Sequence, residues 1–400
     1  MSDNNSRKLL PDKILFSLLI ILFYLIARNI PLCGVDTQAY KNMLPDAEDF
    51  IMQAIGGDTY QYSIVALGLT PFIFSGIIIQ FYTAFKKSVQ KVRVSSKKMN
   101  RLTLILTMIM AVFQAVPLIQ GLKMKQSVYP LWVLQTIAGV QVIAGVSLII
   151  WWIGRNKKYG IGGQTVIIVI NIVDRIRGTF FNHAGEKLLI PCIVSFAVII
   201  IMLIMENAEM RIPLQRVSIH NIYSDKNYLA IKLNPVGVMP VMFASAFYII
   251  PQMLVKGVLF LFPDSVTVLW WVDRMTLSSP VGIIVYLLNL AVLTVVFALI
   301  VIGPGEMAEQ FLQSGDSIVN LHAGKDTKRY LRRTIINLCL LSSVVMGVCI
   351  GVPLFLQIEG RISNELVMLP TSVMMLTGLW ANLFREIKAI KYYDAYDTFL

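Results

Sequence analysis

The sequence predicts an all-α, polytopic membrane protein with ten transmembrane helices in a 5+5 inverted repeat. Three observations lead to this fold class. Hydrophobic residues make up 56% of the chain and charged residues only 14%, whereas soluble domains carry about 25% charged residues. Long stretches without charge recur along the whole chain, and its two halves share a motif. A soluble globular domain is excluded, because too few charges remain to solvate its surface.

Ten stretches lack Asp, Glu, Lys and Arg, and each is a candidate span. They are residues 14–27, 59–85, 102–122, 126–154, 159–173, 188–205, 233–255, 275–305, 334–358 and 366–384. A helix needs about 20 residues to cross the bilayer core, and in lipid the backbone must satisfy its own hydrogen bonds. The first and fifth stretches are short, so we expect polar ends such as Arg28 and Asp174 to reach the interface.

The basic residues are divided unevenly between the two sides of the membrane. With the N-terminus inside, the inside segments hold 25 of the 35 Lys and Arg residues. Because cytoplasmic loops carry an excess of Lys and Arg, we expect a multi-pass protein of the cell membrane with both termini in the cytoplasm. Such a basic face attracts anionic lipid headgroups, and it suits an acidic partner equally well.

Ten spans divide into five and five, and an odd number per half requires the second half to be inverted. The motif G-x-x-P-x-x-F occurs at residues 68–74 in the second span and at 237–243 in the seventh, its counterpart. Inverted repeats place the functional path at their interface. We therefore expect an N-terminal half at 1–186 and a C-terminal half at 187–400, with cytoplasmic loops at about 206–233 and 304–333.

Residue patterns for covalent chemistry are missing from the sequence. The histidines, His183, His220 and His322, have no metal-ligand spacing, and residues 324–327 (GKDT) lack the earlier glycine of a phosphate loop. We therefore expect no enzyme, no metal and no cofactor. The main alternative function is a secondary transporter with a 5+5 inverted repeat, which requires an ionisable site at mid-depth. A membrane-embedded enzyme and an envelope scaffold are further alternatives.

Six motifs, in order along the chain, resemble those of the SecY family, which forms the pore of protein-translocation channels. They are residues 30–36 (IPLCGVD), 68–80 (GLTPFIFSGIIIQ), 159–163 (YGIGG), 210–213 (MRIP), 233–245 (LNPVGVMPVMFAS), and 306–309 with 323–327 (EMAE and AGKDT). The resemblance runs from about residue 10 to residue 400.

The resemblance implies a passive channel that conducts unfolded secretory polypeptides and is driven by a partner ATPase. An apolar ring would close the idle pore by dewetting, without charges. Its members map to Ile73, Ile77, Val169, Met242 and Met375. The family usually has isoleucine where this chain has the two methionines, and the flexible methionine side chain suits a ring that adapts to varied passing chains.

Two further parts of the pore follow from the same resemblance. A plug at about 45–58 would cover the outer side of the ring, through Phe50, Ile51, Met52, Ala54 and Ile55. The second and seventh helices would form a lateral gate to lipid, marked by Pro71, Gln80, Pro240 and Ser245. A signal sequence is itself an apolar helix, so it would partition through this gate.

The cytoplasmic loops depart from the usual SecY pattern. His322 stands where many SecY proteins have arginine, and residues 217–220 (VSIH) replace a basic run. These departures resemble the accessory SecY of Gram-positive bacteria, which exports serine-rich glycoprotein adhesins. The implied partners are a SecA-type motor ATPase, a small SecE-like membrane subunit, the secretory polypeptide and membrane lipid, but not nucleic acid directly. The partner-binding positions are Arg211, Arg216, His322, Lys325, Lys328 and Arg329.

Overall fold

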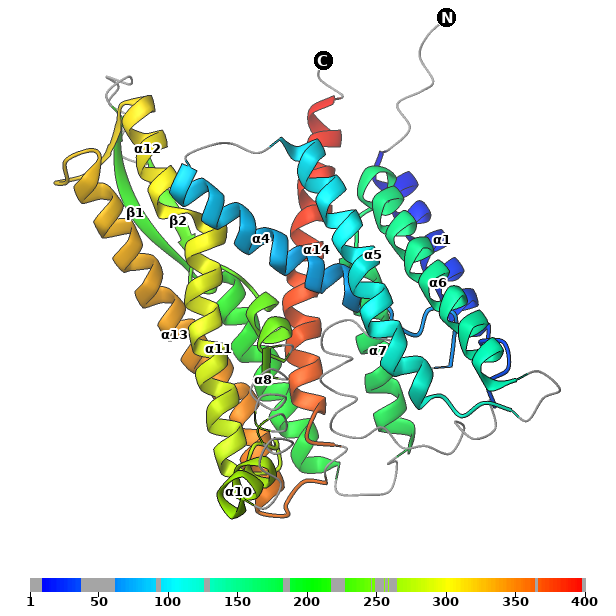
Figure 1. The fold of residues 1–400 in the computed structure, drawn as a ribbon. Coiled ribbons are helices and arrows are strands. Elements are labelled where there is room, and N and C mark those ends of the chain that lie inside the picture. Colours follow the sequence, from blue (N-terminus) through cyan, green and yellow to red (C-terminus); the bar gives the residue numbers. More distant parts are fainter. Residues whose placement is uncertain are drawn as a thin grey trace, which may run out of the picture. The chain divides into compact units, whose positions relative to one another are not determined.

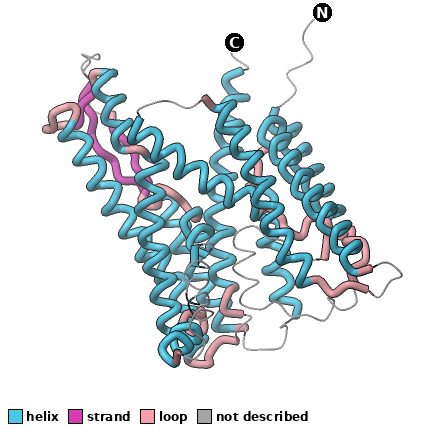
Figure 2. Tube along the Cα trace, viewed as in Figure 1, coloured by secondary structure: helices cyan, strands magenta, loops and turns pink. Residues whose placement is uncertain are grey.

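The chain folds into helices with one small sheet (Figure 2). The structure is a computed structural model that describes residues 9–36, 62–90, 95–125, 130–182, 188–216, 227–245, 247–248, 255, 258, 265–363 and 366–397. It divides into two compact units. Unit 1 comprises Met1–Asn182 and Leu379–Leu400, and unit 2 comprises His183–Gly378.

Unit 1 is built from helices that follow the first five charge-free stretches. They are α1 (Leu9–Arg28), α4 (Thr70–Gln90), α5 (Ser96–Gly121), α6 (Leu131–Tyr159) and α7 (Thr165–Asn182), together with the later part of α14 (Leu369–Asp397). Helix α6 packs against α5 and α1, and α1 also packs against α7; Figure 1 shows α1 and α6 side by side.

Small residues on α6 let neighbouring segments approach its backbone closely. A Cβ on Gly145 would lie 2.0 Å from the carbonyl oxygen of Ile64, and one on Gly139 would lie 2.9 Å from Ile119. Ala138 beside them is fully buried. Segments of unit 1 therefore pack tightly against α6 because its small residues leave room for them, as is common between membrane helices.

Unit 2 contains most of the remaining elements. They are α8 (Leu189–Asn207), β1 (Glu209–Arg216), β2 (Tyr228–Lys232), α10 (Val266–Arg274), α11 (Pro280–Ile302), α12 (Pro304–Ser314), β3 (Asp316–Ile318), α13 (Lys325–Ile358) and the beginning of α14. Helix α11 has a clear start signal, because the Ser279 hydroxyl accepts a hydrogen bond from the Gly282 amide at 3.1 Å and Pro280 follows the cap.

The longest helix pair of unit 2 is joined through a G-x-x-x-G pattern. Helices α11 and α13 lie side by side (Figure 1). A Cβ on Gly351 would lie 3.3 Å from the Leu287 side chain, and one on Gly347 would lie 3.7 Å from it. The two glycines therefore let the Leu287 side chain approach α13 closely, as small residues do between packed membrane helices.

A three-stranded antiparallel sheet corrects the prediction of an all-α chain. Strand β1 lies between β2 and β3, pairing Glu209 with Lys232 at one end and Arg216 with Asp316 at the other. The buried side chains of Ile212, Ile231 and Ile318 provide its apolar face. The sheet forms inside the two loops predicted at 206–233 and 304–333, so these loops are joined rather than independent.

Within the described residues, nine of the ten predicted spans each contain one of the labelled helices. Within the described residues, six helices are long and apolar enough to cross a membrane. They are Leu10–Arg28, Lys97–Gly121, Leu131–Tyr159, Leu189–Asn207, Pro280–Ser314 and Lys325–Ile358, and Thr70–Thr83 is a shorter apolar helix. In the seventh predicted span, residues 239–245 and 247–248 are helical. The ten-helix layout and the halves 1–186 and 187–400 remain predictions.

Candidate functional site

The first copy of the shared motif forms a glycine turn followed by a helix. Gly68 adopts φ +53°, a left-handed conformation that favours glycine because it has no Cβ. Its amide donates to the Val65 carbonyl at 2.7 Å. Helix α4 begins two residues later at Thr70, with Pro71 in its first turn, where the missing N–H of proline costs no helical hydrogen bond. This turn sets the residue at which α4 begins, and hence the positions of the predicted ring residues along the helix axis.

The second copy repeats the same local conformation in unit 2. Gly237 adopts φ +71°, the helical residues begin two positions later at Met239, and Pro240 follows as the second. The Gly237 amide donates to the Asn234 side-chain oxygen at 3.1 Å. Each motif therefore combines a left-handed glycine with a proline in the first turn of the helix, which gives both helices the same starting geometry.

The predicted ring residues of unit 1 lie on α4 and α7. Ile73 and Ile77 lie one turn apart on α4, so they share a face of the helix, and their side chains are 7% and 3% exposed. Val169 on α7 is half-buried. Ser75 on α4 shares a 2.6 Å hydrogen bond with Thr107 of α5, which fixes the α4 helix against its neighbour.

The predicted ring residues of unit 2 lie on the helical residues 239–245 and on α14. Met242 is 5% exposed, and Met375 on α14 is 1% exposed. A Cβ on Gly378 of α14 would lie 2.3 Å from the Val238 side chain, so α14 packs against the turn before the seventh helix. Met242 follows Val238 by one helical turn. All five ring residues are apolar, but their convergence into one ring remains a prediction.

The helical residues 239–245 of the seventh predicted span, called the seventh helix here and distinct from α7, are anchored to α11. They include two of the predicted gate residues, Pro240 and Ser245. Ser245 is fully buried and shares a hydrogen bond with the Tyr286 hydroxyl at 3.2 Å. One turn along α11, the Asn289 amide donates to the Ala244 carbonyl at 3.1 Å. Of the other gate residues, Pro71 and Pro240 lie at helix starts and Gln80 is half-buried on α4. Their meeting across a gate remains a prediction.

A buried asparagine, missed from the sequence, connects the seventh helix to α8 and α13. The Asn234 amide donates to the Glu206 carboxylate at 3.1 Å, and its oxygen accepts from the Ser342 hydroxyl at 3.1 Å as well as from Gly237. Asn234 and Glu206 are each 2% exposed, and Ser342 is fully buried. The only sequence signals were a polar residue inside an apolar motif and an acid ending the sixth apolar run.

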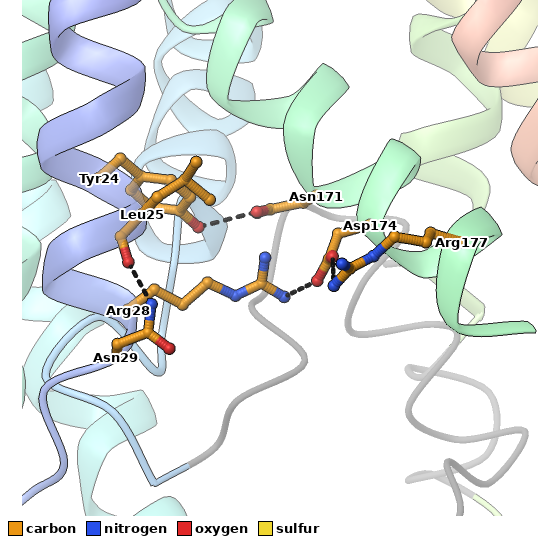
Figure 3. Close-up of polar contacts among 7 residues, drawn as sticks. All are labelled: Tyr24, Leu25, Arg28, Asn29, Asn171, Asp174 and Arg177. Carbon is orange, nitrogen blue, oxygen red and sulfur yellow. Dashed lines mark hydrogen bonds and ion pairs between the residues drawn. The ribbon is translucent and has the colours of Figure 1, made fainter. Parts of the chain in front are cut away.

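A second missed feature is a polar cluster between α1 and α7 (Figure 3). The guanidinium of Arg28 lies 2.9 Å from the Asp174 carboxylate, and the Tyr24 hydroxyl donates to Asn171 at 2.9 Å. The side chain of Arg28 is 3% exposed. Because Arg28 is the last residue of α1, this charge pair lies at the end of that span. The sequence placed both residues at polar helix ends. This is confirmed for Arg28, which ends α1, but it is wrong for Asp174, which lies in the middle of α7 because that helix continues to Asn182. The sequence did not predict that the two residues pair.

The predicted partner-binding residues gather around the sheet of unit 2. Arg211 and Arg216 belong to β1, and the guanidinium of Arg211 lies 4.8 Å from the centre of the Tyr228 ring. Strand β1 pairs with β3, which directly precedes the segment carrying the other four residues. His322 is exposed, and Lys325, Lys328 and Arg329 are exposed at the start of α13. Pairing of β1 with β3 therefore joins the two predicted partner loops.

The plug residues Phe50, Ile51, Met52, Ala54 and Ile55 lie outside the described residues. Across the residues that are described, no three His, Cys, Asp or Glu side chains lie close enough together to hold a metal ion.

Comparison with known proteins identifies the family. The SecY family model matches residues 63–384. The chain is 26% identical to the accessory Sec system protein translocase subunit SecY2 of Leuconostoc gelidum subsp. gasicomitatum, over 96% of both chains. It is also 26% identical to the SecY2 subunit of Streptococcus sanguinis, over 97% of both.

Solved structures show the same fold. A protein-conducting channel matches with a TM-score of 0.66 at 18% identity, covering 96% of this chain and 93% of that one. Sec61 from the canine ribosome–channel complex of the endoplasmic reticulum matches with a TM-score of 0.63 at 16% identity, with the same coverage. The family match covers most of the chain and includes both glycine–proline motifs, so the chain belongs to the SecY family.

Proposed function

We propose that this chain is the pore-forming subunit of a protein-export translocase, conducting unfolded secretory polypeptides across the cytoplasmic membrane with a lateral gate to lipid. The SecY2 relatives align with the chain over nearly its whole length, which supports an accessory Sec pathway. The proposed substrates are serine-rich glycoprotein adhesins. The secondary transporter is less favoured, because the SecY family model matches residues 63–384.

The observation that carries the proposal is the matched geometry of the two motifs. Gly68 and Gly237 both adopt left-handed turns, and Ile73 and Met242 each follow the motif proline by two residues. Two helices with the same start and related by inversion would present these apolar side chains at equivalent depths. This match supports a ten-helix, 5+5 inverted repeat with an apolar ring where the halves meet.

The proposed ring closes the idle pore without charges. Ile73, Ile77, Met242 and Met375 are all nearly fully buried, and a constriction of such side chains excludes ions by dewetting. The chain itself supplies no motor, so a SecA-type ATPase would drive transport. We place its docking surface on β1 and the start of α13, and we expect a small SecE-like subunit in the membrane.

The orientation follows from the basic residues and from unit 1. Helix α1 begins and α14 ends at the same end of unit 1 (Figure 1). The turn before α7 contacts both helices: the Ile161 amide donates to the Ser17 hydroxyl and the Gly162 amide donates to the Glu386 carboxylate. Together with the positive-inside distribution, this supports two cytoplasmic termini.

The test is site-specific photocrosslinking of an arrested secretory chain. A photoreactive residue replaces Ile73, Met242 or Met375, and matched controls replace Phe113 on α5 or Leu189 on α8, which are 72% and 74% exposed. We expect crosslinks to the polypeptide from the three ring positions and none from the controls. A transporter would instead bind a small molecule and give no polypeptide crosslink at the ring, and that result would refute the proposal.

A further inference from the structure

A short helix with exposed tryptophans precedes α11 in unit 2. Helix α10 contains Trp270 and Trp271, whose side chains are 45% and 44% exposed. Leu269 on the same helix is 44% exposed, and Val266 is 79% exposed. Apolar residues that are exposed singly are normal on a protein surface, but several together on one nine-residue helix mark a surface that contacts something other than water.

The tryptophans of α10 lie beside a cation. The Trp270 and Trp271 rings meet edge to face, with their centroids 5.1 Å apart. The guanidinium of Arg274, one turn further along the helix, lies 4.5 Å from the centre of the Trp270 ring, and the Arg274 side chain is exposed. A guanidinium stacked on an aromatic ring keeps its N–H edge available for phosphate oxygens. Helix α10 therefore presents indole rings and a guanidinium together.

The segment after α10 is packed onto the first turn of α11. The Met275 carbonyl accepts a hydrogen bond at 3.0 Å from the hydroxyl of Tyr248, a fully buried residue. The Ser279 hydroxyl, which caps α11, donates to the Thr276 carbonyl at 3.0 Å. A Cβ on Gly282 would lie 2.0 Å from that carbonyl oxygen. These contacts hold the C-terminal end of α10 at the level where α11 begins.

The level at which α11 begins is an end of a membrane span. Helix α11 belongs to a segment that is long and apolar enough to cross a membrane. Its exposed side chains Ile284, Leu288 and Val292 recur at every fourth position, so they share one face of the helix. Acyl chains would cover such a face. In Figure 1, α10 lies at the end of α11 opposite α12 and is viewed nearly end-on, whereas α11 is seen from the side.

We propose that α10 lies in the headgroup region of the bilayer, with Trp270 and Trp271 inserted at the boundary with the acyl chains and Arg274 at the phosphates. Tryptophan favours this level because its ring is apolar and its N–H needs a polar partner. Amphipathic helices with such residues lie in the plane of the membrane interface. The outer leaflet follows from the orientation given with the proposed function, whereas the interfacial position does not depend on it.

Continuity with the apolar face of α11 favours lipid over a protein partner at α10. The lipids whose acyl chains cover Ile284 and Leu288 place their headgroups where α11 begins, which is beside α10. A protein partner would have to displace these lipids and to bring its own acceptor to Arg274, whereas every phospholipid carries a phosphate at this depth. Because Tyr248 belongs to the seventh predicted span, the anchor would also fix the end of that span at the membrane surface.

The experiment uses the full chain in phosphatidylcholine nanodiscs that contain a photoactivatable phosphatidylcholine. The reactive group lies either beside the glycerol, as a shallow probe, or at the end of an acyl chain, as a deep probe, and mass spectrometry maps the labelled residues. We expect residues 266–274 to be labelled mainly by the shallow probe. Leu288 should be labelled by the deep probe. Val319, which follows β3 and is 41% exposed, should be labelled by neither.

A double variant tests the role of the two indole rings. Trp270→Gln/Trp271→Gln should lower the shallow labelling of residues 266–274 roughly tenfold, because it removes the apolar area that the helix buries in the interface. The matched control is Trp380→Gln, at a tryptophan of α14 that is 62% exposed, and it should leave this labelling unchanged. Deep labelling of Leu288 in both variants shows that α11 is still inserted.

Three results would overturn the proposal. Labelling of residues 266–274 by neither probe would mean that α10 faces water or a protein. Equal labelling by the two probes would place α10 among the acyl chains. Shallow labelling that persists in the double variant would show that the tryptophans do not anchor the helix. Crosslinking of an arrested polypeptide to Ile73 in the same nanodiscs reports on the pore separately, so this proposal and the proposed function fail independently.

Discussion

Arg28 and Asp174 form an ion pair 2.9 Å long between the last residue of α1 and the middle of α7. The Arg28 side chain is 3% exposed and that of Asp174 is 20% exposed. Asp174 also pairs with Arg177 at 2.6 Å, but the side chain of Arg177 is 64% exposed. The two contacts of one carboxylate therefore differ sharply in burial, and they should differ as sharply in their contribution to stability.

Removing one partner of the buried pair should be costly. Arg28→Leu removes the buried partner of the Asp174 carboxylate but leaves its exposed contact with Arg177, and we expect a loss of about 1–3 kcal/mol in the free energy of unfolding. The double variant Arg28→Leu/Asp174→Leu should be less destabilised than the single variant, because it also removes the carboxylate that has lost its buried partner. Equilibrium unfolding in detergent measures both.

Arg177→Gln serves as the control for this pair. Its exposed contact should contribute no more than about 1 kcal/mol. If Arg177→Gln destabilised the protein as much as Arg28→Leu, burial would not be the property that gives the pair its strength.

The local elements of this fold could be predicted from the sequence, whereas its long-range polar contacts could not. Charge-free runs predicted the long helices but not the short helices α10 and α12, which carry charged residues. The three strands were missed: β3 has only three residues, and its pairing with β1 joins residues about 100 positions apart. The Arg28–Asp174 pair was missed for the same reason, since only the fold brings the two residues together.

The Asn234 hub should hold the seventh helix in place. Asn234→Leu removes one hydrogen bond each from Glu206, Gly237 and Ser342 at once, and a lost buried hydrogen bond costs about 1–3 kcal/mol where the group stays unsatisfied. We expect a clear loss of stability and a larger ion leak through the idle channel, measured as conductance in planar bilayers. Ser342→Ala removes one hydrogen bond and should cost about 1 kcal/mol with little leak. Equal leaks in the two variants would argue against a hub at Asn234.

The two motif glycines should tolerate no side chain. Gly68→Ala and Gly237→Ala force an L-residue into the left-handed region, which costs about 1–2 kcal/mol. Gly154→Ala is the matched control: this glycine lies within α6 with open space around its Cα, so alanine should be neutral or stabilise the helix by up to about 1 kcal/mol. Thermal unfolding of the three variants measures the difference. A stabilised Gly68→Ala variant would contradict the proposed role of its turn.

The methionines at positions 242 and 375 should make the proposed ring softer than isoleucine would. Met242→Ile and Met375→Ile replace flexible side chains by β-branched ones with a restricted χ1 angle. We expect the double variant to change the stability by less than about 1.5 kcal/mol, to lower the idle ion leak and to slow the export of bulky chains. The measurements are bilayer conductance without substrate and export of a reporter polypeptide. An unchanged leak together with unchanged export would show that these two side chains do not set the closure of the pore.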